Sequence, residues 1–156
     1  MKIRLSTFFL CLTLLAGILP FSRQAQATLG EGPDSVTRDR QALSAAKRAT
    51  TTRTKYTVQE VASDETTVRE YLTTGGVVFA VAWKGRAHPD LSTLLGSYTG
   101  EFQSARRKVP RKHGERRLRV SSDQVIVETW GHMGSLQGRA YLPALLPKGV
   151  SVDEIN

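Results

Sequence analysis

Cysteine is almost absent from this 156-residue sequence, and its one example, Cys11, lies inside an apolar stretch near the N-terminus. The rest of the chain therefore has no thiol for a disulfide, for a zinc ligand or for a nucleophilic enzyme. Such a chain must be held together by an apolar core. Its length allows this, because single domains of ~100–150 residues are the commonest size.

The short motifs that mark common enzyme sites are also missing. No serine lies in a Gly-x-Ser-x-Gly elbow. The glycine-rich stretch Gly131–Ser135 has neither the lysine of a phosphate-binding loop nor the dinucleotide fingerprint. We interpret this stretch as a chain reversal, and the sequence predicts no cofactor.

Residues 1–27 have the pattern of a cleavable secretory signal. Lys2 and Arg4 form a short positive region, Leu5–Phe21 is almost wholly apolar, and Ala25-Gln26-Ala27 places small residues where signal peptidase requires them. The apolar stretch is shorter than the ~20 residues of a membrane-spanning helix. We predict cleavage after Ala27 and a periplasmic or secreted product without a transmembrane segment. An uncleaved membrane anchor is the alternative.

The formal net charge is +8, and the basic excess is concentrated in one segment. Such a segment attracts anionic surfaces, which in a cell envelope include acidic polymers, lipid surfaces and other envelope proteins. Nucleic acid is not expected, because the segment lacks interleaved aromatic residues on which bases stack. A solvated basic loop without a ligand is the alternative. The candidate anion- or partner-binding residues are Arg106, Arg107, Lys108, Arg111, Lys112, Arg116 and Arg117.

Three segments predict an antiparallel meander. Tyr56–Val61 and Thr66–Leu72 have strand character and are separated by a turn at Ser63-Asp64-Glu65. A second turn, at Gly75-Gly76, leads to Val77–Trp83. That run is continuously apolar and rich in β-branched residues, as in a central strand buried on both faces.

A helix is predicted to follow, beginning at Pro89-Asp90, because proline is tolerated in a first turn and aspartate caps it. Its apolar stripe predicts packing on the sheet rather than a cofactor site. Gly96 and Gly100 each lower helix propensity by about 1 kcal/mol relative to alanine, and they either permit close packing or end the helix early. The stripe consists of Leu91, Leu94, Leu95, Tyr98 and Phe102.

Beyond a basic loop at 106–117, the pattern returns to strands. Leu118–Val120 and Val125–Thr129 predict a hairpin, and Gln137–Leu142 predicts one last short strand. Pro143 and Pro147 then argue against regular structure.

The expected fold class is α+β, with an antiparallel sheet of five or six strands and one amphipathic helix packed on one face. This single domain covers residues 56–156. Residues 28–55 have few large apolar side chains and are predicted to form a flexible or partly helical leader, with a short helix over 38–48 as one alternative.

Several segments occur in a recognisable order along the chain. They are Thr67-Val68-Arg69-Glu70-Tyr71 with Gly76–Val81 and Trp83, Pro89-Asp90-Leu91 with Leu94-Leu95-Gly96 and Tyr98, and Gly131-His132-Met133 with Gly138–Pro143 and Leu146–Val150. Together they resemble the bacterial exported family labelled domain of unknown function 2844, from about Leu29 to the C-terminus. The resemblance implies a small exported protein, and it implies no activity or catalytic residue. The basic stretch at 106–117 is not interpreted as a family trait.

The candidate catalytic residues are His88, Asp90, Glu128 and His132. The first two follow the predicted central strand, and the last two lie at the end of a later strand. If these strands are neighbours, the four side chains meet, and they suit zinc binding or acid–base catalysis. Their spacings are not those of established metal sites, and the first two also suit a helix cap.

Trp83, Trp130, Arg139 and Tyr141 have two interpretations. In the first, they line a binding groove, because aromatic and arginine side chains are the usual anchors of binding surfaces. In the second, they belong to a half-buried core. The sequence as a whole favours a non-catalytic envelope binding or structural module. The alternative is a small metal-dependent or acid–base hydrolase that uses the four candidate catalytic residues.

Overall fold

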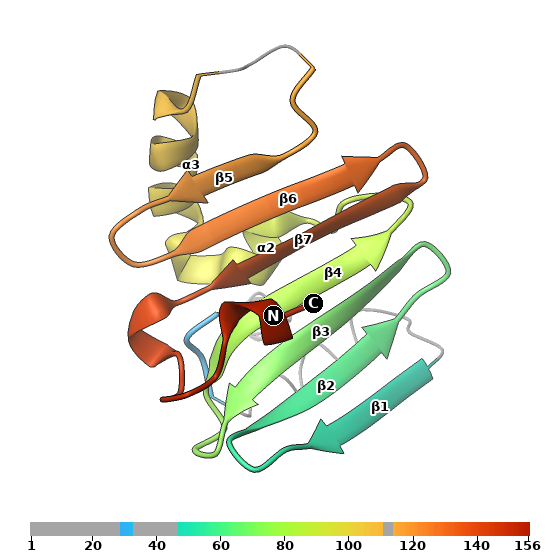
Figure 1. Ribbon diagram of the computed structural model, residues 1–156, viewed down its shortest axis with the longest axis vertical. Coiled ribbons are helices and arrows are strands. Elements are labelled where there is room, and N and C mark those ends of the chain that lie inside the picture. The colour runs from blue at the N-terminus through green and yellow to red at the C-terminus, as the bar shows by residue number, and fades with distance from the viewer. Residues whose placement is uncertain (1–28, 33–46, 111–113) are drawn as a thin grey trace, which may run out of the picture.

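The computed structural model describes residues 29–32, 47–110 and 114–156. The predicted signal peptide, Arg111 and Lys112 lie outside the described residues. Within them, the chain forms a seven-stranded sheet and one helical segment (Figure 1). The strands are β1 (Lys47–Thr52), β2 (Tyr56–Ala62), β3 (Thr66–Thr73), β4 (Val78–Gly85), β5 (Leu118–Ser121), β6 (Ile126–His132) and β7 (Ser135–Tyr141), and the helices are α2 (Leu91–Leu95) and α3 (Thr99–Lys108).

The sheet consists of two meanders joined at its centre. The strand order is β1-β2-β3-β4-β7-β6-β5, and every neighbouring pair is antiparallel. The turns predicted at Ser63-Asp64-Glu65, Gly75-Gly76 and Gly131–Ser135 all connect consecutive strands. Helices α2 and α3 lie between β4 and β5 in the chain, so β5 does not pair with β4. Instead β7, the last strand of the second meander, pairs with β4 and joins the two meanders.

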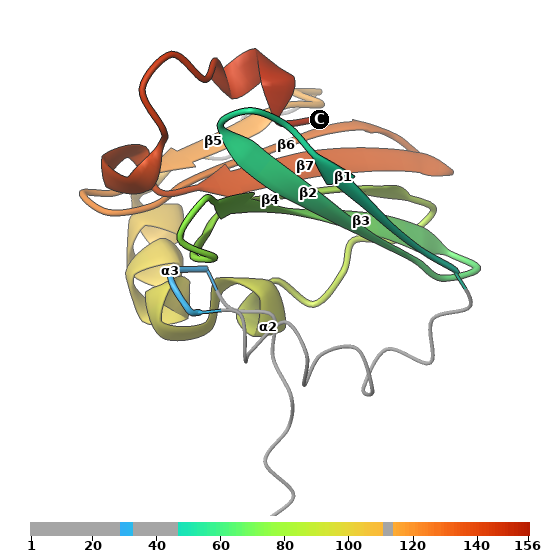
Figure 2. The ribbon, with the colours of Figure 1, turned by 90° about the horizontal axis from the view of Figure 1, so that it is seen from below.

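Each face of the sheet is covered over part of its area (Figure 2). Helices α2 and α3 cover one side, which we call the helix face. Residues 142–156, which we call the tail, return across the other side, the tail face. Val81 of β4 belongs to the core under the helices, whereas Phe79 and Ala82 belong to the core under the tail. The continuous apolar run of β4 is therefore explained by burial on both faces, as predicted.

The apolar stripe of the helical segment packs in the helix-face core, also as predicted. Leu94 and Leu95 are buried there, and the other members of the stripe pack against them. The segment is interrupted at Gly96, where a φ of 50° ends α2, and a 3₁₀ turn over Gly96–Tyr98 leads into α3. Glycine tolerates this conformation because it has no Cβ.

Two expectations about segment boundaries are wrong. The basic loop does not begin at residue 106, since α3 continues to Lys108 and ends in three cationic residues that suit the negative end of the helix dipole. Strand β1 lies within residues 28–55, where the sequence predicts a leader, and it gives the sheet seven strands instead of five or six. Its threonines have strand propensity but are exposed, so no apolar alternation marks them.

Leu29 is a second part of the predicted leader that packs on the sheet. Its side chain is only 1% exposed and lies in the helix-face core. The neighbouring Gly30 N–H donates to the Val78 carbonyl, and the Val78 N–H donates to the Glu31 carbonyl. The alternative helix over 38–48 falls mostly outside the described residues, and its last two positions belong to β1.

The tail contains two 3₁₀ turns, Pro143–Leu145 and Val152–Glu154, in agreement with the prediction that its prolines prevent longer regular structure. Val150 and Ile155 of the tail are buried in the core between it and the sheet. In the described ranges, no helix has the length and apolar character needed to cross a bilayer.

Candidate functional site

One row of residues crosses the whole tail face in register. Two charge pairs lie in it: Arg69 Nε is 2.6 Å from Glu60 Oε2, and Arg139 Nε is 2.6 Å from Glu128 Oε2. Arg119 Nη1 adds a contact of 2.8 Å with Glu128 Oε1. We call this set the charge row, and from β1 to β5 it consists of Ala49, Glu60, Arg69, Ala82, Arg139, Glu128 and Arg119.

The tail is attached at the centre of the charge row, over the small side chain of Ala82. Arg69 donates from Nη1 to the main-chain oxygen of Asn156 at 2.7 Å. Arg139 donates from Nη1 to the carbonyl of Val152, also at 2.7 Å. Two oppositely placed arginines therefore hold the end of the tail on the sheet.

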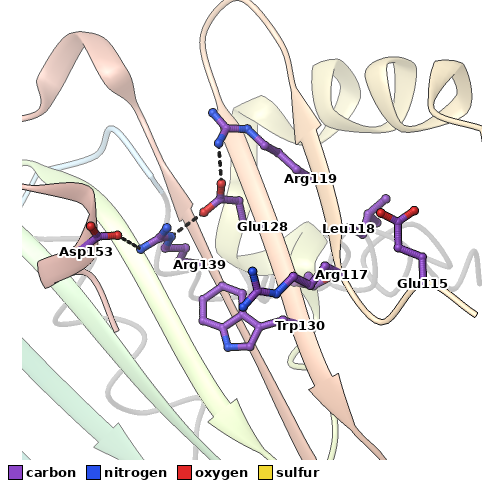
Figure 3. A pocket seen from close by; sticks show the side chains of 9 residues that line it. Glu115, Arg117, Leu118, Arg119, Glu128, Trp130, Arg139 and Asp153 are labelled. Carbon is purple, nitrogen blue, oxygen red and sulfur yellow. Dashed lines mark hydrogen bonds and ion pairs between the residues drawn. The ribbon is translucent and has the colours of Figure 1, made fainter.

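A hollow of about 430 Å³ lies beside the tail, at the β5 end of the charge row (Figure 3). We call it the arginine hollow. The Arg117 side chain extends into it from the segment before β5 and points toward Trp130 of β6. It is lined by Glu115, Arg117, Leu118, Arg119, Glu128, Thr129, Trp130, Arg139 and Asp153.

Arg139 is a fixed part of this hollow. Its side chain is 16% exposed, and its guanidinium is occupied by Glu128 and by the tail carbonyls. The same guanidinium lies 5.6 Å from the centre of the Trp130 ring, within the range of a cation–π contact. The indole is therefore positioned by an arginine that is itself held on several sides.

Arg117 differs from Arg139 in having no protein partner. In the described part of the chain its exposed side chain makes neither a hydrogen bond nor an ion pair, and the same is true of Arg116. Because a guanidinium binds carboxylates through paired hydrogen bonds, Arg117 offers free cationic donors in the hollow, and Arg116 offers others just outside its lining.

A smaller hollow of about 160 Å³ shares Trp130 with the arginine hollow. It lies further toward β3, at the same end of the sheet, and Lys84 of β4 and Gln137 of β7 are in its wall. We call it the lysine hollow. Its full lining is Glu60, Thr67, Arg69, Ala82, Trp83, Lys84, Trp130, Gln137, Gly138 and Asn156.

Comparison with known proteins identifies the family. The model of a protein family of unknown function, DUF2844, matches residues 25–155. The chain belongs to the DUF2844 family. This agrees with the resemblance carried by the order of its segments. No curated protein and no solved structure matches the chain.

In this DUF2844 chain the four candidate catalytic residues are engaged separately. Strands β4 and β6 end on the same side of the sheet, as convergence requires. His88 Nδ1, however, accepts a hydrogen bond from Trp83 Nε1 at 3.1 Å, and Asp90 caps α2 by accepting from Ser92. Glu128 is paired with arginines on the tail face.

The fourth candidate, His132, lies at the β6–β7 turn with Nδ1 3.0 Å from the Met133 carbonyl oxygen. No hydrogen bond or ion pair in the described ranges joins any two of the four. Nor do the described residues include a group of three or more histidines, cysteines or carboxylates that could hold a metal ion. The helix-cap interpretation of Asp90 is the one that the structure shows.

Five of the seven predicted basic residues are within the described ranges, and they lie along one edge of the DUF2844 sheet. Arg106, Arg107 and Lys108 form the last turn of α3, which packs against β5, and Arg116 and Arg117 directly precede that strand. The first three of these residues therefore belong to a helix, whereas Arg116 and Arg117 lie in a loop, as predicted, directly before the edge strand.

The four predicted groove residues divide into two pairs. Trp83 and Tyr141 are buried core residues, whereas Trp130 and Arg139 line the arginine hollow. Sequence reasoning missed Lys84 and Gln137, because only the β4–β7 register places them beside Trp130. Lys84 lies just beyond the apolar run Val77–Trp83 that predicts the central strand, and the local pattern around Gln137 does not specify which strand pairs with its own.

Proposed function

We propose that this DUF2844 protein is an exported, non-catalytic module that binds an acidic polysaccharide of the cell envelope in the arginine hollow. The observation that carries the proposal is the pairing of a fixed aromatic side chain with an unpartnered cation. Trp130 is held in place by Arg139, and Arg117 faces it across the hollow without a partner of its own.

The chemistry of the hollow suits a sugar that carries carboxylate groups. The C–H face of a pyranose ring packs on the negatively polarised face of an indole. A carboxylate on that sugar forms charge-assisted hydrogen bonds with a guanidinium such as that of Arg117. The basic residues at the end of α3 raise the local concentration of a polyanion before it enters.

A lipid surface fits the same charges less well. The arginine hollow is concave, and a flat array of head groups would contact the exposed arginines but leave the partly buried Trp130 untouched. An acidic polymer that enters the hollow contacts both the indole and the arginines. The proposal therefore commits to the polymer, and lipid binding is an alternative outcome of its test.

Binding is tested with polygalacturonate as the carboxylated probe, neutral dextran as the uncharged one and vesicles containing phosphatidylglycerol as the lipid one. We expect polygalacturonate alone to bind and to change Trp130 fluorescence, with an affinity that falls as salt screens the charges. The double variant Arg116→Gln/Arg117→Gln should bind at least about tenfold more weakly, because the charge-assisted contact of Arg117 is lost and the nearby charge of Arg116 no longer attracts the polymer.

The matched control is Arg53→Gln/Lys148→Gln, which removes the same charge from exposed positions outside both hollows. It should bind as the unaltered chain does. Equal binding by the two double variants, or binding of vesicles in place of polygalacturonate, would overturn the polysaccharide proposal.

Export is the second part of the proposal, and the pattern of residues 1–27 supports it. Fractionation of the bacterium that makes the protein, followed by N-terminal sequencing, provides the test. We expect a periplasmic or released chain that begins at Thr28. Recovery of the chain with Met1 intact, in the cytosol or in the membrane, would show that it is not processed as proposed.

A further inference from the structure

Three neighbouring rows of side chains run across the tail face, and each has a different environment. The first contains Tyr71 and Tyr141 and is buried under the tail. The second is the charge row, in which the arginines and glutamates are paired with each other or with the tail. The third row, one step further along the strands, lies beside the tail in the lysine hollow and the arginine hollow.

The third row, which we call the open row, is aligned by the strand register. Lys84 of β4 lies opposite Gln137 of β7, which lies opposite Trp130 of β6. Thr67 of β3 extends the row beyond Lys84, and Arg117 extends it past Trp130, because its neighbour Leu118 pairs with Thr129. The row therefore joins the lysine hollow to the arginine hollow, with Trp130 between them.

The polar side chains of the open row have no partners within the described ranges. Thr67, Lys84, Gln137 and Arg117 make no side-chain hydrogen bond or ion pair there. This contrasts with the adjacent charge row, where pairing is extensive. Donors aligned from β3 to the segment before β5 and left unsatisfied by the described residues are available to a ligand that runs in the same direction.

We propose that the open row is an extended binding site for a linear acidic saccharide chain that lies across the strands. Arg117 holds a carboxylate at one end, the Trp130 ring stacks on a sugar near the middle, and Lys84 holds a second carboxylate at the other end. Gln137 donates to a hydroxyl between them. This inference rests on the proposed function and adds the direction and the minimum length of the ligand.

The spacing of the strands sets that length. Neighbouring strands lie ~4.8 Å apart, so three strand steps separate the backbones of Arg117 and Lys84 by ~14 Å. When both side chains extend away from the sheet, their cations stay about this far apart, which is further than one sugar reaches. The arrangement requires an oligomer of several units, and affinity should increase steeply with chain length until both ends are occupied.

The test uses galacturonic acid and its linear oligomers of increasing length as probes, with calorimetry and tryptophan fluorescence as readouts. Trp83, which is 3% exposed, also lines the lysine hollow, so calorimetry gives the affinities and tryptophan fluorescence reports contact of the ligand with either indole. We expect Lys84→Gln to weaken binding of long oligomers about tenfold, as the loss of one charge-assisted contact predicts, and to leave the shortest bound probe unaffected. Arg117→Gln should weaken both.

The control is Lys148→Gln, the same exchange at an exposed position in the tail, and circular dichroism verifies that each variant is folded. Equal binding of long oligomers by Lys84→Gln and Lys148→Gln would overturn the extended site while leaving the arginine hollow intact. An unaltered affinity in Arg117→Gln, or no binding of any oligomer by the unaltered chain, would instead overturn the proposed function itself.

Discussion

Arg69 and Arg139 lie on either side of Ala82 in one row of the sheet, and each donates from Nη1 to a main-chain oxygen of the tail at 2.7 Å. Each also forms a 2.6 Å contact through Nε with a glutamate on the next strand. Both arginines thus join two strands to the tail. The tail, in turn, separates the buried part of this face from the open row.

Replacing Arg139 with alanine should destabilise the fold. Glu128, whose side chain is 14% exposed, would lose its closer partner, and the Val152 carbonyl would lose its donor. Removal of one member of a largely buried ion pair costs ~3 kcal/mol. Urea unfolding monitored by circular dichroism measures the change in free energy.

Arg119→Ala is the matched control for that experiment. Arg119 contacts the same glutamate, but its side chain is 60% exposed, and exposed ion pairs contribute about 0–1 kcal/mol. A similar loss of stability in both variants would contradict the structural role assigned to Arg139.

Tyr71→Phe should loosen the end of the tail without disturbing the core. The Tyr71 hydroxyl donates to the main-chain oxygen of Asn156 and accepts from its N–H, and the ring is buried against Phe79. Phenylalanine keeps the ring and removes both hydrogen bonds, at a cost of about 1 kcal/mol for each net bond.

Hydrogen exchange provides the local measurement for this variant. The amide of Asn156 should exchange faster in Tyr71→Phe than in the unaltered chain, whereas the amides of β4 at the sheet centre should be affected only through global stability. Unchanged protection at Asn156 would show that the hydroxyl does not hold the tail.

The sequence predicted the strands whose burial alternates or is continuous. Strand β4 could be identified because it is buried on both faces, and the β5–β6 hairpin could be identified from two short β-branched segments around a polar turn. Strand β1 could not be identified from the sequence, because it lies at an edge of the sheet with exposed threonines and no apolar face. Local patterns report burial, and this strand has little of it.

The candidate site was harder to predict than the fold. Trp130 and Arg139 could be proposed as groove residues from their types alone, and Arg117 from the basic segment. Their convergence with Lys84 depends on the pairing of β4 with β7, two strands separated by the helices and a hairpin. Such pairing is a property of the folded chain, and a local pattern does not specify it.

Gly96 and Gly100 should respond oppositely to alanine. Gly96 has a φ of 50° and ends α2, a conformation that residues with a Cβ avoid, so Gly96→Ala should cost ~1 kcal/mol or more. Gly100 lies in the first turn of α3 with open space around its Cβ position, so Gly100→Ala should stabilise by up to ~1 kcal/mol.

Thermal unfolding of the two alanine variants checks this pair directly. The melting temperature should fall for Gly96→Ala and rise for Gly100→Ala. A rise in both would show that the break between α2 and α3 does not require glycine and that one continuous helix is equally compatible with the sequence.

Acid should destabilise the protein through three carboxylates that cap or join elements. Hydrogen bonds from Ser92 and Thr93 lower the pKa of Asp90 below its usual 3.8. Hydrogen bonds from Ser122 and the Gln124 N–H lower the pKa of Glu101 below its usual 4.5. Hydrogen bonds from the Ser151 N–H and the Tyr56 hydroxyl lower the pKa of Glu154 in the same way.

The sign of the effect follows from these directions. A carboxylate whose pKa is lower in the folded chain stabilises it at pH values above the pKa of the unfolded chain. That contribution is lost as the pH falls through 4.5 for the glutamates and 3.8 for the aspartate, toward the lower folded-state values.

Urea unfolding across this pH range should therefore show a decreasing free energy of unfolding as the pH falls. The decrease should be shallower in Asp90→Asn and Glu154→Gln, because those groups no longer titrate. If both variants retained the full slope, the hydrogen bonds to these carboxylates would not be the origin of the acid sensitivity.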